Sequence, residues 1–167
     1  MLWFRADMGL PSFDPAALPA ALDDESGPPF SLDLNGETVQ VHLVSVGNPH
    51  CVVFLPGLRP EEWTRFGPGL ERHRAFPQRS NVEFVSVLDR HNIEVRMWER
   101  GVGRTCSSGT GSCASAAASI RAGLAQSPVR VHTEKGVLTV EWEPGGNVYI
   151  EGPAAQVWKG EFLWNGR

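Results

Sequence analysis

The residues best suited to chemistry are most densely grouped between Trp98 and Ala118. The stretch begins with the alternation typical of a strand, passes a glycine-rich loop, and ends in an alanine- and serine-rich run typical of a helix. Backbone N–H groups at a helix start point outward together, and the helix dipole adds partial positive charge there. Ser108-Gly109-Thr110-Gly111 is therefore predicted to be an anion site. Taken alone, these four residues fit a plain capped helix start equally well.

Three polar positions outside this loop are further candidates. At Glu99-Arg100, the arginine can grip a carboxylate in bidentate fashion and the glutamate can bind an ammonium group, so the pair suits an amino acid. A structural ion pair or solvated charges is the commoner interpretation of an isolated Glu-Arg. The turn Asn48-Pro49-His50 can place an amide and a proton-relaying imidazole at a pocket rim, or can be a plain β-turn. Asn81, at the head of a strand, has the same two interpretations.

The cysteines and Ser108 raise the question of a nucleophile or base. Cys106 precedes the helix, where dipoles and cations stabilise a thiolate. Cys113 lies within the helix and is predicted to be a small core residue. Spacing alone assigns no Ser-His-Asp arrangement. Three cysteines, including Cys51, make neither a disulfide framework nor a metal-ligand set, so we expect no metal and a reducing, cytoplasmic location.

Length and composition narrow the class of protein. The chain has 167 residues, 41% of them hydrophobic and 20% charged, which favours one folded domain of ordinary size. Its net charge of −4, without a basic stripe, argues against nucleic acid as a partner. The apolar stretches are too short to span a bilayer, and the N-terminus lacks the pattern of a signal peptide, so we expect neither a membrane segment nor a leader.

Local patterns predict a mixed fold. Asn35-Gly36 is the preferred sequence for a type I′ hairpin turn. The returning strand changes phase near Val44, which indicates a bulge or burial on both faces. Strands are expected at 1–9, 31–34, 38–46, 51–55, 81–88, 93–98, 129–133, 137–142 and 147–150, helices at 15–22, 60–73 and 112–122, and a polar loop at 23–29. Because the last helix has no broad polar face and stops at Gly123, we expect an α+β domain with a mostly antiparallel sheet wrapped around this alanine-rich central helix.

Several stretches keep a common order and spacing over nearly the whole chain. They are residues 6–9 (Ala-Asp-Met-Gly), 47–52 (Gly-Asn-Pro-His-Cys-Val), 76–77 (Phe-Pro), 81–85 (Asn-Val-Glu-Phe-Val), 99–103 (Glu-Arg-Gly-Val-Gly), 109–114 (Gly-Thr-Gly-Ser-Cys-Ala) and 152–154 (Gly-Pro-Ala). Together they resemble the diaminopimelate epimerase family and its wider superfamily of proline-racemase-like and PhzF-like isomerases.

The resemblance implies an architecture of two similar lobes. Each lobe is a sheet wrapped on a central helix, and each supplies one cysteine to an active site between them. The chain, residues 1–167, resembles the C-terminal lobe alone, and residues 153–164 correspond to a strand that crosses to the N-terminal lobe. Its apolar side chains, such as Trp158 and Phe162, would have no partner in this chain. We therefore expect self-association or a complementary N-terminal lobe.

The resemblance also implies a mechanism without a cofactor. One cysteine thiolate removes the α-proton and the other thiol returns a proton on the opposite face. His50 and Glu99 would assist the proton traffic. The substrate-binding residues implied by position are Asn48, Asn81, Glu99, Arg100, Gly109 and Thr110, the last two through amides that hold the α-carboxylate.

The sequence departs from the family at two positions of the glycine loop. The family usually reads Glu-Thr-x-Ala-Cys-Gly-Thr-Gly, whereas residues 104–111 read Arg-Thr-Cys-Ser-Ser-Gly-Thr-Gly. Ser108 stands at the position of the catalytic cysteine, and Arg104 at that of the glutamate. A serine hydroxyl is a far weaker acid than a thiol of pKa ~8.5, although it can donate a proton or position a water. Cys106 can substitute only if the loop is remodelled.

The leading expectation is a cofactor-independent amino-acid epimerase or racemase, similar to diaminopimelate epimerase of the lysine and peptidoglycan precursor pathway, in truncated or split form. One alternative is a non-catalytic half-enzyme or amino-acid-binding module. Another is a dehydratase or isomerase of the superfamily with Ser in place of one Cys.

Overall fold

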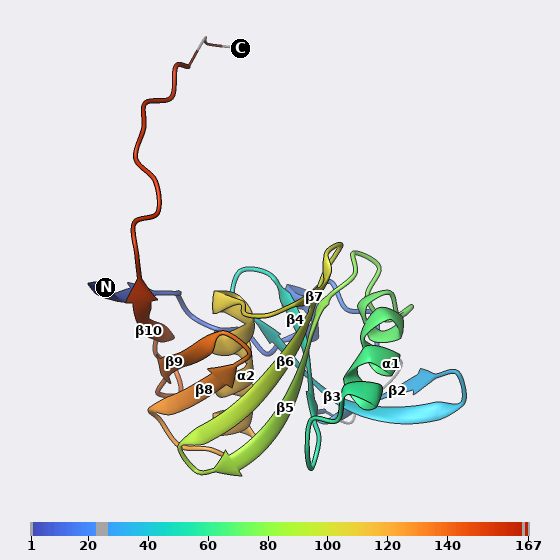
Figure 1. Ribbon diagram of the computed structural model, residues 1–167. Helices are drawn as coiled ribbons and strands as arrows, with labels where there is room; N and C mark the ends of the chain where they lie inside the picture. Colours follow the sequence, from blue (N-terminus) through green and yellow to red (C-terminus); the bar gives the residue numbers. More distant parts are fainter. Residues whose placement is uncertain (1, 23–26, 165, 167) are drawn as a thin grey trace.

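The computed structural model describes residues 2–22, 27–164 and 166, so Met1 and residues 23–26 of the predicted strand and loop lie outside the described part. In chain order the elements are β1 (Leu2–Asp7), the 3-10 turn η1 (Pro15–Ala17), β2 (Phe30–Leu34), β3 (Glu37–Ser45), β4 (Pro49–Phe54), α1 (Pro60–Glu71), β5 (Asn81–Asp89), β6 (Asn92–Glu99), β7 (Gly103–Thr105), α2 (Gly109–Arg121), β8 (Val129–Thr133), β9 (Gly136–Glu141) and β10 (Tyr149–Ala154). They form the α+β fold that the sequence predicts (Figure 1).

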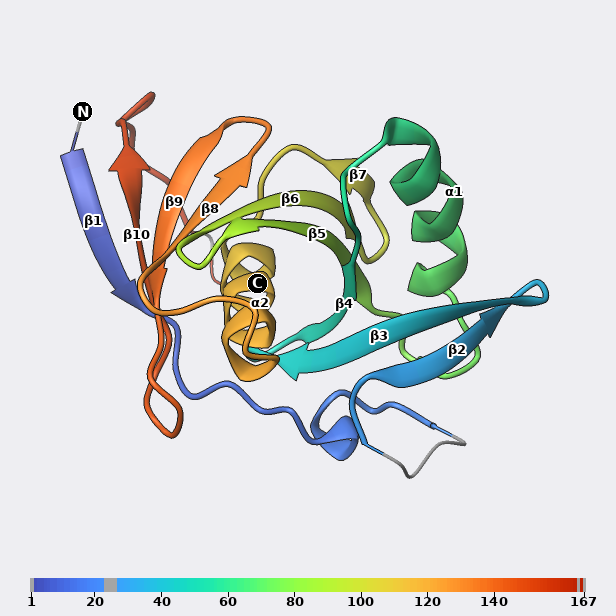
Figure 2. The ribbon, with the colours of Figure 1, turned by 90° about the horizontal axis from the view of Figure 1, so that it is seen from below.

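The described strands form one sheet in the order β1-β10-β9-β8-β6-β5-β4-β3-β2, with β7 paired to β6. The pairs β4–β5 and β6–β8 are parallel and the others antiparallel. The sheet curls so that its strands surround α2 (Figure 2). This arrangement confirms a mostly antiparallel sheet wrapped around a central helix.

Helix α2 can occupy the centre because its side chains are small. Residues 111–119 are all buried, and they are glycine, serine, cysteine and alanine only. A buried hydroxyl needs a hydrogen-bond partner. Ser112, Ser115 and Ser119 each donate to the backbone carbonyl four residues earlier, at 2.7–2.8 Å, so the helix satisfies its own hydroxyls and presents an apolar surface to the sheet.

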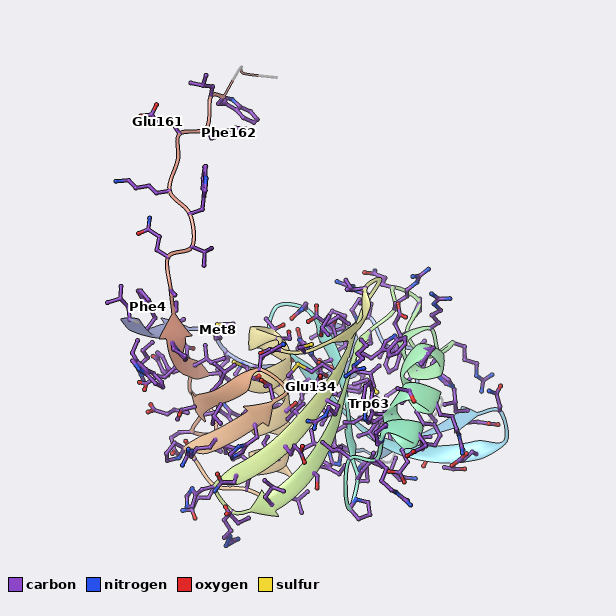
Figure 3. The ribbon with its side chains drawn as sticks, in the orientation of Figure 1. Phe4, Met8, Trp63, Glu134, Glu161 and Phe162 are labelled. Atoms are coloured by element: carbon purple, nitrogen blue, oxygen red, sulfur yellow. The ribbon has the colours of Figure 1, made fainter. Side chains whose placement is uncertain are left out.

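The outer face of the sheet is covered by α1, which gives the strands a second core. Val39, Val41 and Leu43 of β3 pack in the cluster beside α1, whereas Val44 and Val46 pack in the cluster around α2. The phase change near Val44 therefore reflects burial on both faces of the strand. Trp63 of α1 is 3% exposed and lies on the sheet side of that helix (Figure 3).

Most local predictions hold, and the exceptions have physical causes. Asn35 and Gly36 both have positive φ (57° and 86°), as a type I′ turn requires, and Gly123 ends α2 with a φ of +72°. The helix expected at 15–22 is wrong: only one 3-10 turn forms, because Pro19 cannot continue a helix. Helix α2 begins at Gly109, three residues earlier than predicted, because Ser108 caps it. Strand β7, three residues long, was not predicted.

The C-terminal residues leave the body of the molecule. Strand β10 ends at Ala154 and pairs with β1, and residues 155–164 have no regular secondary structure. This segment extends away from the sheet, as Figures 1 and 3 show. Trp158, Phe162 and Trp164 are at least 74% exposed, so a large apolar surface is uncovered. Neither described α-helix is long and apolar enough to cross a membrane.

Candidate substrate-binding site

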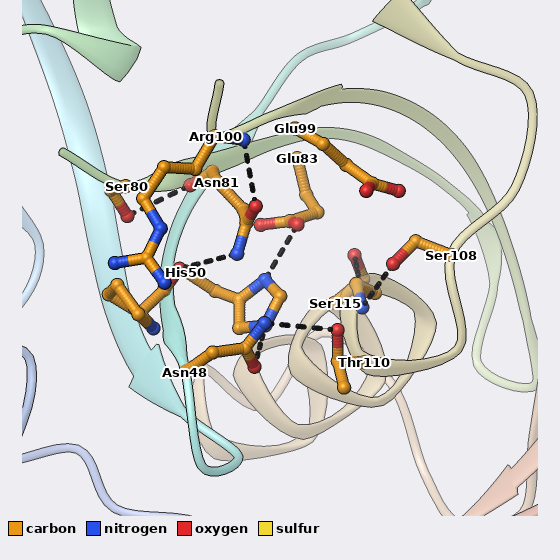
Figure 4. Close-up of polar contacts among 12 residues, drawn as sticks. Asn48, His50, Ser80, Asn81, Glu83, Glu99, Arg100, Ser108, Thr110 and Ser115 are labelled. Atoms are coloured by element: carbon orange, nitrogen blue, oxygen red, sulfur yellow. Dashed lines mark hydrogen bonds and ion pairs between the residues drawn. The ribbon is translucent and has the colours of Figure 1, made fainter. Parts of the chain in front are cut away.

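Four segments bring the candidate residues to one end of the sheet (Figure 4). Because β4 and β5 are parallel, with His50 opposite Asn81, the starts of these two strands lie together. Strand β6 runs antiparallel to β5, so its end, which carries Glu99, comes to the same place. The N-terminus of α2 faces these strands, and Ser108 caps it. Residues scattered over sixty positions of sequence thus share one wall.

A chain of polar contacts runs from the core to the helix start. His50 Nδ1 lies 2.7 Å from Glu83 Oε1, and His50 Nε2 lies 2.8 Å from Asn48 Oδ1. Asn48 Nδ2 in turn donates to Thr110 Oγ1 at 3.4 Å. His50 is fully buried and both ring nitrogens are engaged, so the expectation of an imidazole at a pocket rim is corrected: His50 reaches the site through Asn48.

Glu83 is the site residue that sequence reasoning missed. It is buried, and its Oε2 atom has no hydrogen-bond partner among the described residues. Burial raises the pKa of its carboxyl; the adjacent His50 opposes that shift and Glu99 adds to it. The close approach needs a glycine, since a Cβ at position 111 would stand 2.9 Å from Glu83 Oε1. The available signal was an acidic residue in the middle of the apolar run 82–87.

Asn81 ties two turns of the site together. Its Nδ2 donates to the Pro49 carbonyl at 2.9 Å, and its Oδ1 accepts from the Arg100 N–H at 2.9 Å. The Arg100 guanidinium donates to the Gln78 carbonyl at 3.3 Å. The Arg100 and Glu99 side chains diverge in Figure 4, and the described residues contain no Glu99–Arg100 ion pair.

The two departures from the family pattern have structural roles. Ser108 is half-buried, and its Oγ accepts from the Gly111 N–H at 3.3 Å, which makes it the N-cap of α2. Arg104 forms an ion pair with Glu134 at 3.0 Å, and its guanidinium lies 5.0 Å from the ring centre of Trp63. Both features stabilise the loop locally.

The other candidate groups differ in accessibility. Glu99 is half-buried and accepts from the Thr105 hydroxyl at 2.9 Å. Cys106 is exposed. Cys113 is fully buried, as expected of a core residue, and burial raises its pKa to about 12. A thiol with that pKa is protonated near neutral pH, so Cys113 is unsuited to act as a base.

The start of α2 leaves two N–H groups for a ligand. The first N–H groups of a helix have no carbonyl within the helix to bond. Ser108 satisfies those of Gly111, through its Oγ, and of Ser112, through its carbonyl oxygen. The N–H groups of Gly109 and Thr110 have no partner among the described residues, and they lie beside the Asn48 amide at the positive end of the helix dipole. The arrangement can hold a small anion such as a carboxylate.

Solved structures of epimerases have the same fold. The structure of a predicted epimerase from Pseudomonas aeruginosa aligns over 90% of this chain and 55% of its own, with a TM-score of 0.54 and 21% identity. That of a hydroxyproline epimerase from Agrobacterium vitis, with bound trans-4-hydroxy-L-proline, aligns over 75% of this chain and 45% of its own, with a TM-score of 0.55 and 15% identity. At these identities the likeness establishes the fold alone: this chain shares the fold of the aligned part of these structures.

Sequence comparison identifies the family. The diaminopimelate epimerase family model matches residues 42–157. The chain is 42% identical over 159 residues to the diaminopimelate epimerase of Moorella thermoacetica, covering 95% of this chain and 57% of the relative. It is 42% identical over 156 residues to that of Pseudomonas entomophila, covering 93% and 56%. The chain therefore belongs to the diaminopimelate epimerase family, and it spans little more than half the length of these relatives.

Proposed function

We propose that this chain forms one wall of a cofactor-independent epimerase site for an amino acid, with diaminopimelate of lysine biosynthesis as the substrate. One observation carries the proposal: the free N–H groups of Gly109 and Thr110, the Asn48 amide and the Glu99 carboxylate converge at one end of the sheet. Donors suit an α-carboxylate, and an acceptor suits an α-ammonium group. Membership of the diaminopimelate epimerase family supports the choice of substrate.

The proton transfer requires a group on each face of the α-carbon. Ser108 stands at the end of the helix nearest the bound carboxylate, so we assign it to one face, where it returns a proton or orients a water. Its hydroxyl is too weak an acid to replace a thiolate base. We therefore propose that the base on the other face comes from a second lobe, while Glu99 stabilises the proton being moved. Asn81 and Arg100 keep the wall in shape and border the substrate.

The second lobe is a further part of the proposal. The chain spans 56–57% of its relatives' length, and residues 155–164, which follow β10 and extend away from the sheet, expose apolar side chains. We propose that this segment packs on a complementary N-terminal lobe or on a second copy of the chain. The three free cysteines support a reducing, cytoplasmic compartment.

The test is α-proton exchange in deuterated water. The chain is mixed with an N-terminal lobe taken from a family relative, and diaminopimelate is followed by NMR. We expect exchange, faster in Ser108→Cys because a thiol is the better acid, and reduced in Ser108→Ala. Cys106→Ala is the matched control and should exchange as the parent does, because Cys106 is exposed on the loop. Absence of exchange in the parent and in Ser108→Cys, with diaminopimelate bound, would rule out the epimerase.

A second candidate function is an amino-acid-binding module. The capping bond from Gly111 N–H to Ser108 Oγ favours it, because this bond explains the serine without any role in proton transfer. This candidate predicts diaminopimelate binding by isothermal calorimetry with no exchange, and no gain from Ser108→Cys. Exchange above the buffer rate in the parent would exclude it.

A further inference from the structure

The buried His50–Glu83 pair connects to the substrate wall at one point. Both side chains are 1% exposed, so neither can meet a substrate directly. Asn48 is half-buried and contacts His50 on one side and Thr110 on the other. Gain or loss of a proton by the His50–Glu83 pair can therefore affect the substrate wall through the Asn48 amide.

With the Asn48 amide oriented as in the structure, Nδ2 toward Thr110 and Oδ1 toward His50, the contacts set how many hydrogens the pair holds. Asn48 Oδ1 carries no hydrogen, so the hydrogen of its 2.8 Å contact belongs to His50 Nε2. The 2.7 Å contact between His50 Nδ1 and Glu83 Oε1 requires a second hydrogen between those two atoms. The pair thus holds one proton more than a neutral imidazole beside a carboxylate. Its net charge is zero, which is the state that burial favours.

Loss of that extra proton would exchange the positions of the oxygen and nitrogen of the Asn48 side-chain amide. An ionised Glu83 only accepts, so the remaining hydrogen stays on His50 Nδ1. Nε2 and Asn48 Oδ1 would then be two acceptors 2.8 Å apart. Rotating the amide by half a turn removes the conflict, because Asn48 Nδ2 then donates to Nε2. Thr110 permits this rotation, since its hydroxyl can donate to Oδ1 as readily as it accepts from Nδ2.

We propose that Glu83, acting through His50, makes Asn48 a proton-linked switch that offers the site an N–H donor when the pair holds its extra proton and a carbonyl acceptor when it does not. Glu83 is thus a positioning residue. A donor suits a substrate carboxylate, so the protonated pair is the binding-competent state. The last step rests on the proposed function, in which Asn48 meets the substrate, whereas the switch itself does not.

The titratable and charged groups around the His50–Glu83 pair either favour its extra proton or are held in one protonation state by burial. Glu99, at the end of β6, favours retention of the extra proton, because its charge raises the pKa of Glu83. Cys51 of β4 is fully buried, and burial raises its pKa well above the ordinary value. Burial likewise raises the pKa of Cys113 of α2 to about 12. Helix α2 carries no charged side chain before Arg121 at its far end, so only its N-terminal dipole acts on the pair.

The experiment is a pH titration of the ¹⁵N-labelled full chain, followed by NMR between about pH 5.5 and 9. We expect the His50 Nε2 signal and the Asn48 side-chain amide signals to shift with one common midpoint. In Glu83→Gln, which is nearly isosteric and cannot ionise, the Asn48 signals should stay constant over this range. Glu94→Gln is the matched control, because Glu94 lies on the adjacent strand and pairs with Arg96; it should titrate like the parent.

The inference is overturned if the parent's Asn48 signals do not move over the range. It is equally overturned if they move with the same midpoint in Glu83→Gln. The titration of the parent chain tests the switch even if Glu83→Gln does not fold, and this titration needs no substrate. The affinity for diaminopimelate should be measured separately as a function of pH. In the parent it should fall about tenfold per pH unit above the midpoint, and in Glu83→Gln it should not change with pH. A chain that binds no diaminopimelate yet shows the common midpoint would count against the proposed function and leave the switch supported.

Discussion

Glu71 anchors the turn that carries Glu99 and Arg100, and its replacement by glutamine should destabilise the fold. The carboxylate is 3% exposed and accepts from the Gly101 N–H at 2.9 Å and from Trp98 Nε1–H at 3.2 Å. Arginine nitrogens lie 3.6 Å from each of its oxygens. Burial alone would raise the pKa of Glu71, but these hydrogen bonds and charges outweigh burial and hold the pKa below its ordinary value.

The expected loss follows from the donors that Glu71→Gln leaves unmatched. Glutamine has one acceptor oxygen, so either the Gly101 or the Trp98 N–H would face an amide NH₂ group. Losing one hydrogen bond to a charged acceptor costs about 1.5–3 kcal/mol. The ion pairs with Arg72 and Arg79 add little, because both arginines are more than half exposed. We expect the free energy of unfolding to fall by about 2–3 kcal/mol at pH 7.

The loss should depend on pH in a definite direction. Because folding lowers the pKa of Glu71, its charged form contributes stability above the ordinary value of 4.5, and this contribution is lost as the pH falls through the folded-state pKa. Urea unfolding should therefore show the full difference between parent and Glu71→Gln at pH 7 and a smaller one near pH 3. Glu62→Gln on the same helix removes an ion pair with the exposed Arg59 and should cost less than about 0.5 kcal/mol. Equal differences at the two pH values, or none at pH 7, would refute this reasoning.

Three further predictions concern the glycine loop and the C-terminal segment. Gly111→Ala should lower the melting temperature, because the added Cβ would stand 2.9 Å from the buried Glu83 Oε1 atom. The control Gly109→Ala meets nothing within 4 Å and should be neutral or stabilise the chain by up to about 0.8 kcal/mol. A higher melting temperature for Gly111→Ala would contradict this reasoning. Ser108→Ala should destabilise the chain by about 1 kcal/mol through loss of the N-cap, and an unchanged midpoint in urea would show that the cap contributes nothing. Replacing Trp158 and Phe162 together with serine should reduce self-association in light scattering, since both are at least 75% exposed; equal association in the double variant would place the contact elsewhere.

The cap and the catalytic assignment of Ser108 make separable predictions. Ser108→Ala tests both, because it removes the capping oxygen and the hydroxyl at the substrate face. Ser108→Asp keeps a capping acceptor, since aspartate is as good an N-cap as serine, but it places a charge where the substrate carboxylate is proposed to bind. Restored stability with diaminopimelate binding lost in Ser108→Asp would therefore assign the cap and the binding wall to the same residue.

The sequence by itself determined the elements whose signals are local. The turn at Asn35-Gly36 needs two positive φ values, the stop at Gly123 needs one, and both follow from the residue types alone. The small residues of α2 likewise indicate a helix that a sheet can surround. The resemblance of the motifs to the family implies that Asn48, Glu99 and the glycine loop border one substrate.

Tertiary structure decided the contacts between those elements. Whether His50 stood at a rim or in the core depended on the register of β4 against β5, which brings it beside Glu83, 33 residues later in the chain. No local pattern encodes that contact, and the acidic residue in an apolar strand acquires its meaning only from the imidazole on the neighbouring strand β4. The same holds for Ser108. Its type could be read from the sequence, but its bond to Gly111 depends on where the helix begins, and that start is set by the cap itself and by packing against the sheet.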